Sequence, residues 1–109
     1  MSSRVDRVNE LIKTTIAEII SREIDIDPGV FVTVTKVDTS RDLRYTRVFV
    51  SIFPEKTFGK TMEYLKKKIF VVQGILNKKL HMKPLPRIEF MVDKTEAEAD
   101  KIEKLLKEL

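Results

Sequence analysis

The chain has 109 residues, of which 42% are hydrophobic, and these values fit one folded domain and exclude a disordered tail. It contains no Cys, which excludes disulfides and thiolate metal sites. No apolar run approaches the roughly 20 residues of a membrane span, and residues 1–11 lack the apolar segment of a signal peptide. We therefore expect residues 1–109 to form a single cytoplasmic domain.

The first predicted element is an amphipathic helix. Ser3 can cap its first turn, and Asp6 places a negative charge near the positive end of the helix dipole. The sequence Asp27-Pro28-Gly29 cannot continue a helix and predicts the turn that follows. Apolar residues at spacings of three and four predict the buried face: Val5, Val8, Ile12, Ile16, Ile19 and Ile20.

Two strands are predicted next. Residues 30–37 are β-branched and alternating, and residues 45–53 also alternate before Pro54 ends the run. The polar connection over residues 38–44 is short, which favours an antiparallel hairpin. One face of the second strand is predicted to carry Thr46, Val48, Val50 and Ile52, and the other face Tyr45, Arg47, Phe49, Ser51 and Phe53.

The second half predicts a long helix, a third strand and a last helix. The long helix ends before Pro84 and Pro86, and residues 88–92 alternate as a strand. Thr95 and Glu98 match a capping box for the last helix. The apolar stripe of the long helix is Phe58, Met62, Leu65, Ile69, Val72, Leu76 and Leu80.

The predicted fold is therefore an α+β sandwich with helices on one face of a three-stranded sheet. With a break in the long helix at Gly74, its order is α-β-β-α-α-β, the order of a type II K-homology RNA-binding domain, followed by a C-terminal helix.

Positive charge is concentrated in one part of the sequence. The net charge is +4, but residues 60–87 carry eight Lys or Arg and a single acid, Glu63, for a net +7. Residues 1–59 net zero and residues 88–109 net −3. Such a block predicts a surface that faces a polyanion, although a solvated, solubilising lysine face explains the charge alone equally well.

Gly74 lies on the basic side of the predicted helix. At about 100° per residue it shares a side with Lys60, Lys67 and Lys78, opposite the apolar stripe. A glycine inside a helix is unfavourable by up to about 1 kcal/mol relative to Ala, so its presence needs a reason. Either the helix breaks there, or a phosphate backbone approaches closely, and a break would allow both.

The sequence offers little for catalysis. Its one His, His81, lies in a basic stretch between Leu80 and Met82, and the chain has neither a Walker-type phosphate loop nor enough ligands for a catalytic zinc. We expect no enzyme activity, no cofactor and no metal. Generic single-stranded RNA binding is also disfavoured, because the basic face has few aromatic residues on which bases could stack.

Three stretches together resemble the ribosome-binding factor A family. They are SRVDRVNELI at residues 3–12, VTVTKVDTSRDLRYTRVFVSIF at residues 32–53 and LPRIEFMVDKT at residues 85–95. The resemblance covers almost the whole chain in the expected order, and it implies the type II K-homology fold. The family's Ala-X-Gly element would correspond to Val72-Gln73-Gly74, and Asn77 stands where the family commonly has Arg.

The resemblance also implies the biological role. It implies binding to the small (30S) subunit of the bacterial ribosome, contact with 16S rRNA, and a function in late maturation and in growth in the cold. We expect a monomer with no small-molecule substrate and no membrane partner. The alternative is a protein-interaction module whose lysines only keep it soluble.

The predicted RNA-binding face combines the basic block with a second cluster at the first helix. Arg4 and Arg7 form that second cluster. The main set is Lys60, Lys67, Gly74, Lys78, Lys79, Lys83 and Arg87.

Overall fold

The computed structural model describes residues 3–83 and 85–94. Its elements confirm the predicted order, and the predicted last helix lies outside the described residues. The elements are α1 (Arg4–Glu23), β1 (Phe31–Thr39), β2 (Tyr45–Phe53), a short 3-10 helix η1 (Glu55–Thr57), α2 (Phe58–Lys67), α3 (Ile69–Lys79) and β3 (Arg87–Val92).

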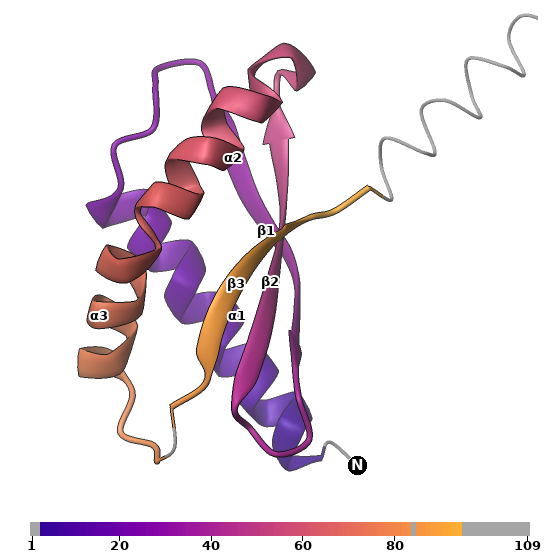
Figure 1. The fold of residues 1–109 in the computed structure, drawn as a ribbon, viewed down its shortest axis with the longest axis vertical. Helices are drawn as coiled ribbons and strands as arrows, with labels where there is room; N and C mark the ends of the chain where they lie inside the picture. The colour runs from indigo at the N-terminus through magenta and orange to yellow at the C-terminus, as the bar shows by residue number, and fades with distance from the viewer. Residues whose placement is uncertain (1–2, 84, 95–109) are drawn as a thin grey trace, which may run out of the picture.

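The three strands form one mixed sheet in the order β1-β2-β3. The hairpin strands β1 and β2 are antiparallel, as predicted. The helical crossover through α2 and α3 returns the chain so that β3 pairs parallel to β2, with Thr46 opposite Ile88 and Val48 opposite Phe90. The helices pack on one face of this sheet, and no described helix covers the other face (Figure 1).

The predicted buried faces are confirmed. In α1 the apolar stripe is buried except for Val5, which is partly buried, and in the stripe of the second half only Phe58 and Ile69 are not fully buried. In β1 a register shift between Val34 and Lys36 breaks the simple alternation, so that Val34 and Val37 both contact the core.

The start of α1 is fixed by a reciprocal cap. The Asp6 N–H donates to the Ser3 hydroxyl at 3.1 Å, and the Ser3 N–H donates to the Asp6 carboxylate at 3.2 Å. The helix ends at Glu23, before the predicted turn, in which Gly29 adopts a φ of 84° and the Val30 N–H donates to the Asp27 carbonyl. The start of the helix therefore follows from local chemistry, whereas its end at Glu23 lies before the residues that form the turn.

The helix break lies at Lys68, so the predicted break at Gly74 is wrong. Lys68 has φ −90° and ψ 6°, a conformation open to any L residue, and its N–H donates to the carbonyls of Tyr64 and Leu65 at 3.1 Å. Gly74 lies inside α3. The apolar spacing passes through the break unchanged, which is why the sequence pattern did not reveal it.

Gln73 joins α3 to the beginning of β3. Its side-chain amide donates to the Pro86 carbonyl at 3.1 Å and to the Asn77 side chain at 3.0 Å. Its amide oxygen accepts the Ile88 N–H at 2.9 Å. Because β3 is an edge strand, this side chain satisfies a backbone donor that no neighbouring strand pairs with.

Replacing Gln73 by Leu is expected to lower the free energy of unfolding by about 1–3 kcal/mol, because it leaves the half-buried Ile88 N–H and Pro86 carbonyl without their partner. Urea denaturation followed by circular dichroism measures the change. Asn77→Ala is the matched control, since Asn77 is exposed and its loss leaves both backbone groups paired. Equal stability of the Leu variant and the original chain would contradict the role given to Gln73.

Candidate nucleic-acid interface

The five lysines of the predicted main set lie along the helix pair α2–α3 and in the connection after it. The two helices succeed each other along one side of the molecule (Figure 1). Lys60 lies in the first turn of α2, Lys67 at its end, Lys78 and Lys79 in the last turn of α3, and Lys83 in the connection that follows. All five are exposed. We call these residues the lysine ridge.

The ion pairs of the lysine ridge are weak. Lys60 lies 3.9 Å from the Asp27 carboxylate and Lys67 lies 3.5 Å from Glu63, and all four side chains are more than two-thirds exposed. Exposed pairs of this kind contribute about 0–1 kcal/mol, so a phosphate can displace them. Within residues 3–83 and 85–94, the other three lysines of the ridge pair with no carboxylate.

Gly74 faces solvent, as the sequence predicted. A Cβ built on it meets nothing within 4 Å among the described residues, so internal packing does not require a glycine. Because the helix is not broken there, backbone freedom does not require one either. The structure therefore gives no internal reason for this glycine.

Gly74→Ala is expected to raise the free energy of unfolding by about 0.5–1 kcal/mol, because Ala is the better helix former at an exposed position with free space. If an RNA backbone approaches this point, the same variant should bind the small subunit less tightly. Thermal denaturation and a subunit-binding titration measure the two quantities. A stabilised variant with unchanged affinity would remove Gly74 from the interface.

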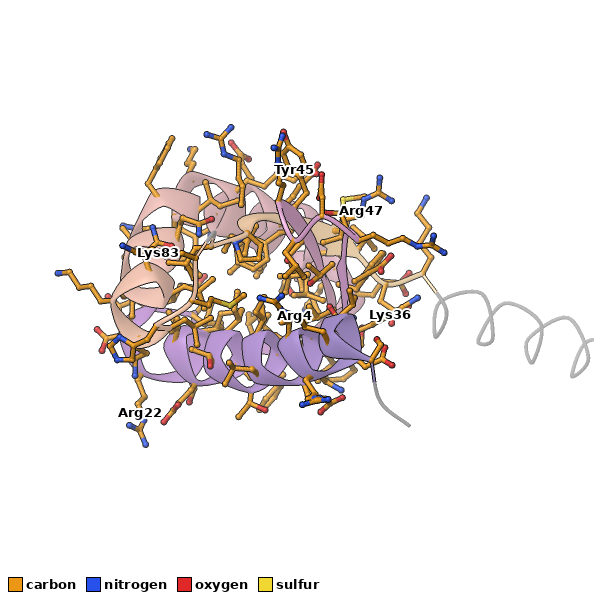
Figure 2. The ribbon with its side chains drawn as sticks, turned by 90° about the horizontal axis from the view of Figure 1, so that it is seen from below. Arg4, Arg22, Lys36, Tyr45, Arg47 and Lys83 are labelled. Atoms are coloured by element: carbon orange, nitrogen blue, oxygen red, sulfur yellow. The ribbon has the colours of Figure 1, made fainter. Side chains whose placement is uncertain are left out.

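Arg87 is separated from the lysine ridge. It begins β3 and is exposed, while its neighbours Ile88 and Phe90 point to the core, so it lies on the uncovered face of the sheet. Its strand partner is Tyr45, which is exposed on that same face together with Arg47. Figure 2 shows Tyr45 and Arg47 pointing away from the helix layer. The aromatic residues of β2 thus belong to the sheet's other face.

Arg4 and Arg7 are exposed in the first turn of α1. Figure 2 shows Arg4 at the α1 side and Lys83 at the α3 side of the molecule, so the two clusters are distinct. Arg7 borders a shallow hollow whose lining includes Lys13 and Lys36 but also Asp6 and Glu10. This mixture of charges makes the Arg4–Arg7 cluster a weaker anion site than the lysine ridge.

The loop between β1 and β2 also carries basic residues. Asp42 accepts hydrogen bonds from the Ser40 hydroxyl at 2.6 Å and from the Arg44 N–H at 3.1 Å, and these bonds hold the pKa of its carboxyl below the usual value. The carboxylate lies 3.9 Å from the Arg44 guanidinium. The negative charge of Asp42 therefore reduces the positive potential around Arg44.

Two features of the helix pair were not predicted from the sequence. Lys66 is exposed beside Lys67 and adjoins the lysine ridge. Phe70, in the first turn of α3, has 86% of its surface exposed. The expectation of few aromatic residues on the basic side did not include this ring, which lies between Lys67 and Lys78 in the chain. Helical phase could have revealed it, because Phe70 lies four residues before the solvent-facing Gly74.

The described residues provide neither a helix suited to crossing a bilayer nor a cluster of three or more potential metal-ligating side chains.

Comparison with known proteins identifies the family. The family model of ribosome-binding factor A matches residues 4–106. The chain belongs to the ribosome-binding factor A family. Ribosome-binding factor A of Natranaerobius thermophilus is 39% identical to it over 108 residues, which are 97% of this chain and 82% of that relative.

Two structures of this family share the fold. The crystal structure of ribosome-binding factor A from Thermus thermophilus has a TM-score of 0.71 and 25% identity, covering 84% of this chain and 97% of that one. A homology model of the Thermus thermophilus factor, fitted into the cryo-EM map of a 30S complex, has a TM-score of 0.65 and 28% identity, covering 78% and 90%. The resemblance predicted from three sequence stretches is confirmed.

Proposed function

We propose that this chain is a non-catalytic maturation factor that binds the 30S ribosomal subunit through 16S rRNA, acts late in subunit assembly and supports growth in the cold. The lysine ridge carries the proposal, because it places exposed positive charge along one side of a folded domain. Membership of the ribosome-binding factor A family supports it, as does the related factor that was fitted into a 30S complex.

The proposed mechanism is occupancy. The ridge attracts phosphates at long range and gives fast attachment that depends little on sequence. Specificity then comes from shape, because A-form RNA hides its base edges in a deep, narrow groove and displays its backbone and 2′-hydroxyl groups. A bound domain holds one local conformation of the rRNA while later assembly steps proceed.

The proposed contacts fall into one main set and two smaller ones. Arg4 and Arg7 form a second contact at the start of α1, and Arg87 contributes separately from the uncovered face of the sheet. The main set is Lys60, Lys67, Gly74, Lys78, Lys79 and Lys83. We propose that the protein acts in the cytoplasm as a monomer and needs no cofactor or small-molecule substrate.

Sedimentation with immature and mature 30S subunits at two salt concentrations tests the proposal. If the five lysines of the ridge contact phosphates, affinity should fall about 100-fold or more between 50 and 200 mM salt. Binding through an apolar surface, as in a protein-interaction module, would respond far less to salt. Stoichiometric, salt-sensitive binding supports the proposal, and salt-insensitive binding would favour the module.

The same preparation tests the absence of catalysis. Purified protein should show no nucleotide hydrolysis, RNA cleavage or RNA modification while it binds subunits. Turnover that purifies with the protein and disappears in His81→Ala would overturn the occupancy mechanism.

A further inference from the structure

Phe70 is exposed in the middle of a basic surface. It is the most exposed of the large hydrophobic residues for which the structure gives an exposure, at 86%, and it lies in the first turn of α3. Lys66 and Lys67 precede it at the end of α2, and both are exposed. Exposing a whole phenyl ring is unfavourable in water by about 2 kcal/mol relative to burial, so a partner that covers the ring would gain part of this free energy.

The neighbours of Phe70 leave its ring accessible. Along the exposed side of α3, the residue one turn on is Gly74 and the residue two turns on is Lys78. A Cβ at Gly74 would meet nothing within 4 Å among the described residues, so the position one turn after Phe70 is open. The exposed side of α3 therefore carries the ring, then a position without a side chain, then a lysine.

The other exposed aromatic residues are placed differently. Phe31 and Phe53 lie with ring centroids 6.5 Å apart on the sheet, outside the lysine ridge. Tyr64, next to the ridge, is half-buried and has the Lys68 ammonium 5.7 Å from its ring centroid. Among the described residues, only Phe70 combines a bare ring with exposed lysines on both sides along the chain.

We propose that Phe70 stacks on an unpaired RNA base, so that the lysine ridge recognises a phosphate backbone with an extruded or bulged nucleotide and not an uninterrupted duplex. This inference rests on the proposed function and names the RNA feature that the ridge selects. Lysines at either end hold the flanking phosphates, and the absence of a side chain at Gly74 lets the nucleotide approach the helix. Stacking on an aromatic ring tolerates any base, because every base has a π-face.

The charge around Phe70 favours RNA over a protein partner. Lys is depleted in the cores of protein–protein interfaces, because burying an ammonium group without a counter-charge is unfavourable. Lys66 and Lys67 precede Phe70 in the chain and Lys78 follows it two helical turns on, and Glu63 is the only carboxylate paired with any of them among the described residues. A phosphate backbone supplies the counter-charge that these lysines lack.

The test uses two RNA hairpins that differ by one nucleotide. One has a fully paired stem and the other carries a single bulged 2-aminopurine, whose fluorescence falls when it stacks. The full chain should bind the bulged RNA more tightly and quench the probe. Phe70→Ala should remove the quenching and weaken bulge binding roughly 5- to 150-fold, while its affinity for the paired hairpin changes little.

Two further variants make the test specific. Phe70→Tyr keeps a stacking ring and should behave like the original chain, whereas Phe53→Ala removes an exposed ring of similar exposure, 68%, outside the ridge and should change nothing. Equal affinity of the original chain for both hairpins, or a Phe70→Ala variant that still quenches the probe, would overturn the stacking proposal alone. If the original chain binds neither of the two hairpins and also fails to bind the 30S subunit, the result would contradict the proposed function as well. A Phe70→Ala variant that loses subunit binding but keeps its bulge preference would indicate a protein contact and overturn the stacking proposal.

Discussion

Replacing Lys67, Lys78 and Lys79 together by Gln is expected to weaken binding to the small subunit by about 100- to 500-fold at 0.1 M salt. Each lysine that neutralises a phosphate contributes about 0.7–0.9 to the slope of log K against log salt, so three lost contacts flatten the slope by about 2–3. All three side chains are exposed, and the fold should survive. Binding titrations at several salt concentrations measure both quantities.

A matched control removes the same charge elsewhere. Arg22, Lys56 and Lys94 are also exposed but lie outside both the lysine ridge and the Arg4–Arg7 cluster, so their joint replacement by Gln should leave the slope nearly unchanged. Equal effects of the two triple variants would show that only net charge matters. An unchanged slope in the ridge variant would instead move the contact to the first turn of α1 or to Arg44 and Arg47.

Phe90→Ala is expected to lower the free energy of unfolding by about 3–5 kcal/mol. Phe90 lies in β3 with 2% of its surface exposed, and it is among the largest fully buried side chains of the described residues. Removing its ring leaves a cavity at the centre of the helix–sheet core, where a domain of this size has only about 5–15 kcal/mol of total stability. Urea denaturation followed by circular dichroism measures the loss.

Phe70 provides the control for this prediction within the same chain. Phe70→Ala removes the same ring from an exposed position and should change stability by less than about 0.5 kcal/mol. Comparable losses in the two variants would mean that Phe70 contributes to folding, and its proposed role in RNA binding would then need another explanation.

The sequence predicted the elements whose signals are local. The Ser3–Asp6 cap, the turn at Pro28-Gly29 and the alternating faces of β2 depend on residues close together in the chain, and each is confirmed. The break at Lys68 was not predictable in this way, because it needs no special residue and leaves the apolar spacing intact. A glycine is a usual signal of a helix break, but this helix pair breaks elsewhere.

The charge of the candidate site could be predicted from the sequence, but which residues share one surface could be predicted only in part. The lysines of residues 60–83 were found because they gather in the sequence and then on one helix pair. Arg87 was grouped with them because it is near in sequence, but the strand alternation turns it to the opposite side of the sheet. Phe70 lies outside the predicted apolar stripe and was assigned no role from the sequence, although it shares a helix side with Gly74.

The parallel pairing of β3 with β2 affects when this protein can become active during its synthesis. Both helices that carry the lysine ridge lie between these two strands in the chain, and Gln73 of α3 is held by backbone groups at the start of β3. Pairing between segments distant in sequence forms late in folding, because the intervening loop must first be closed. In nascent chains that end before Arg87, we therefore expect α2 and α3 to lack the contacts that they make with β3. Only a chain translated through β3 would present the complete surface, so unfinished copies would not compete with finished ones on the ribosome.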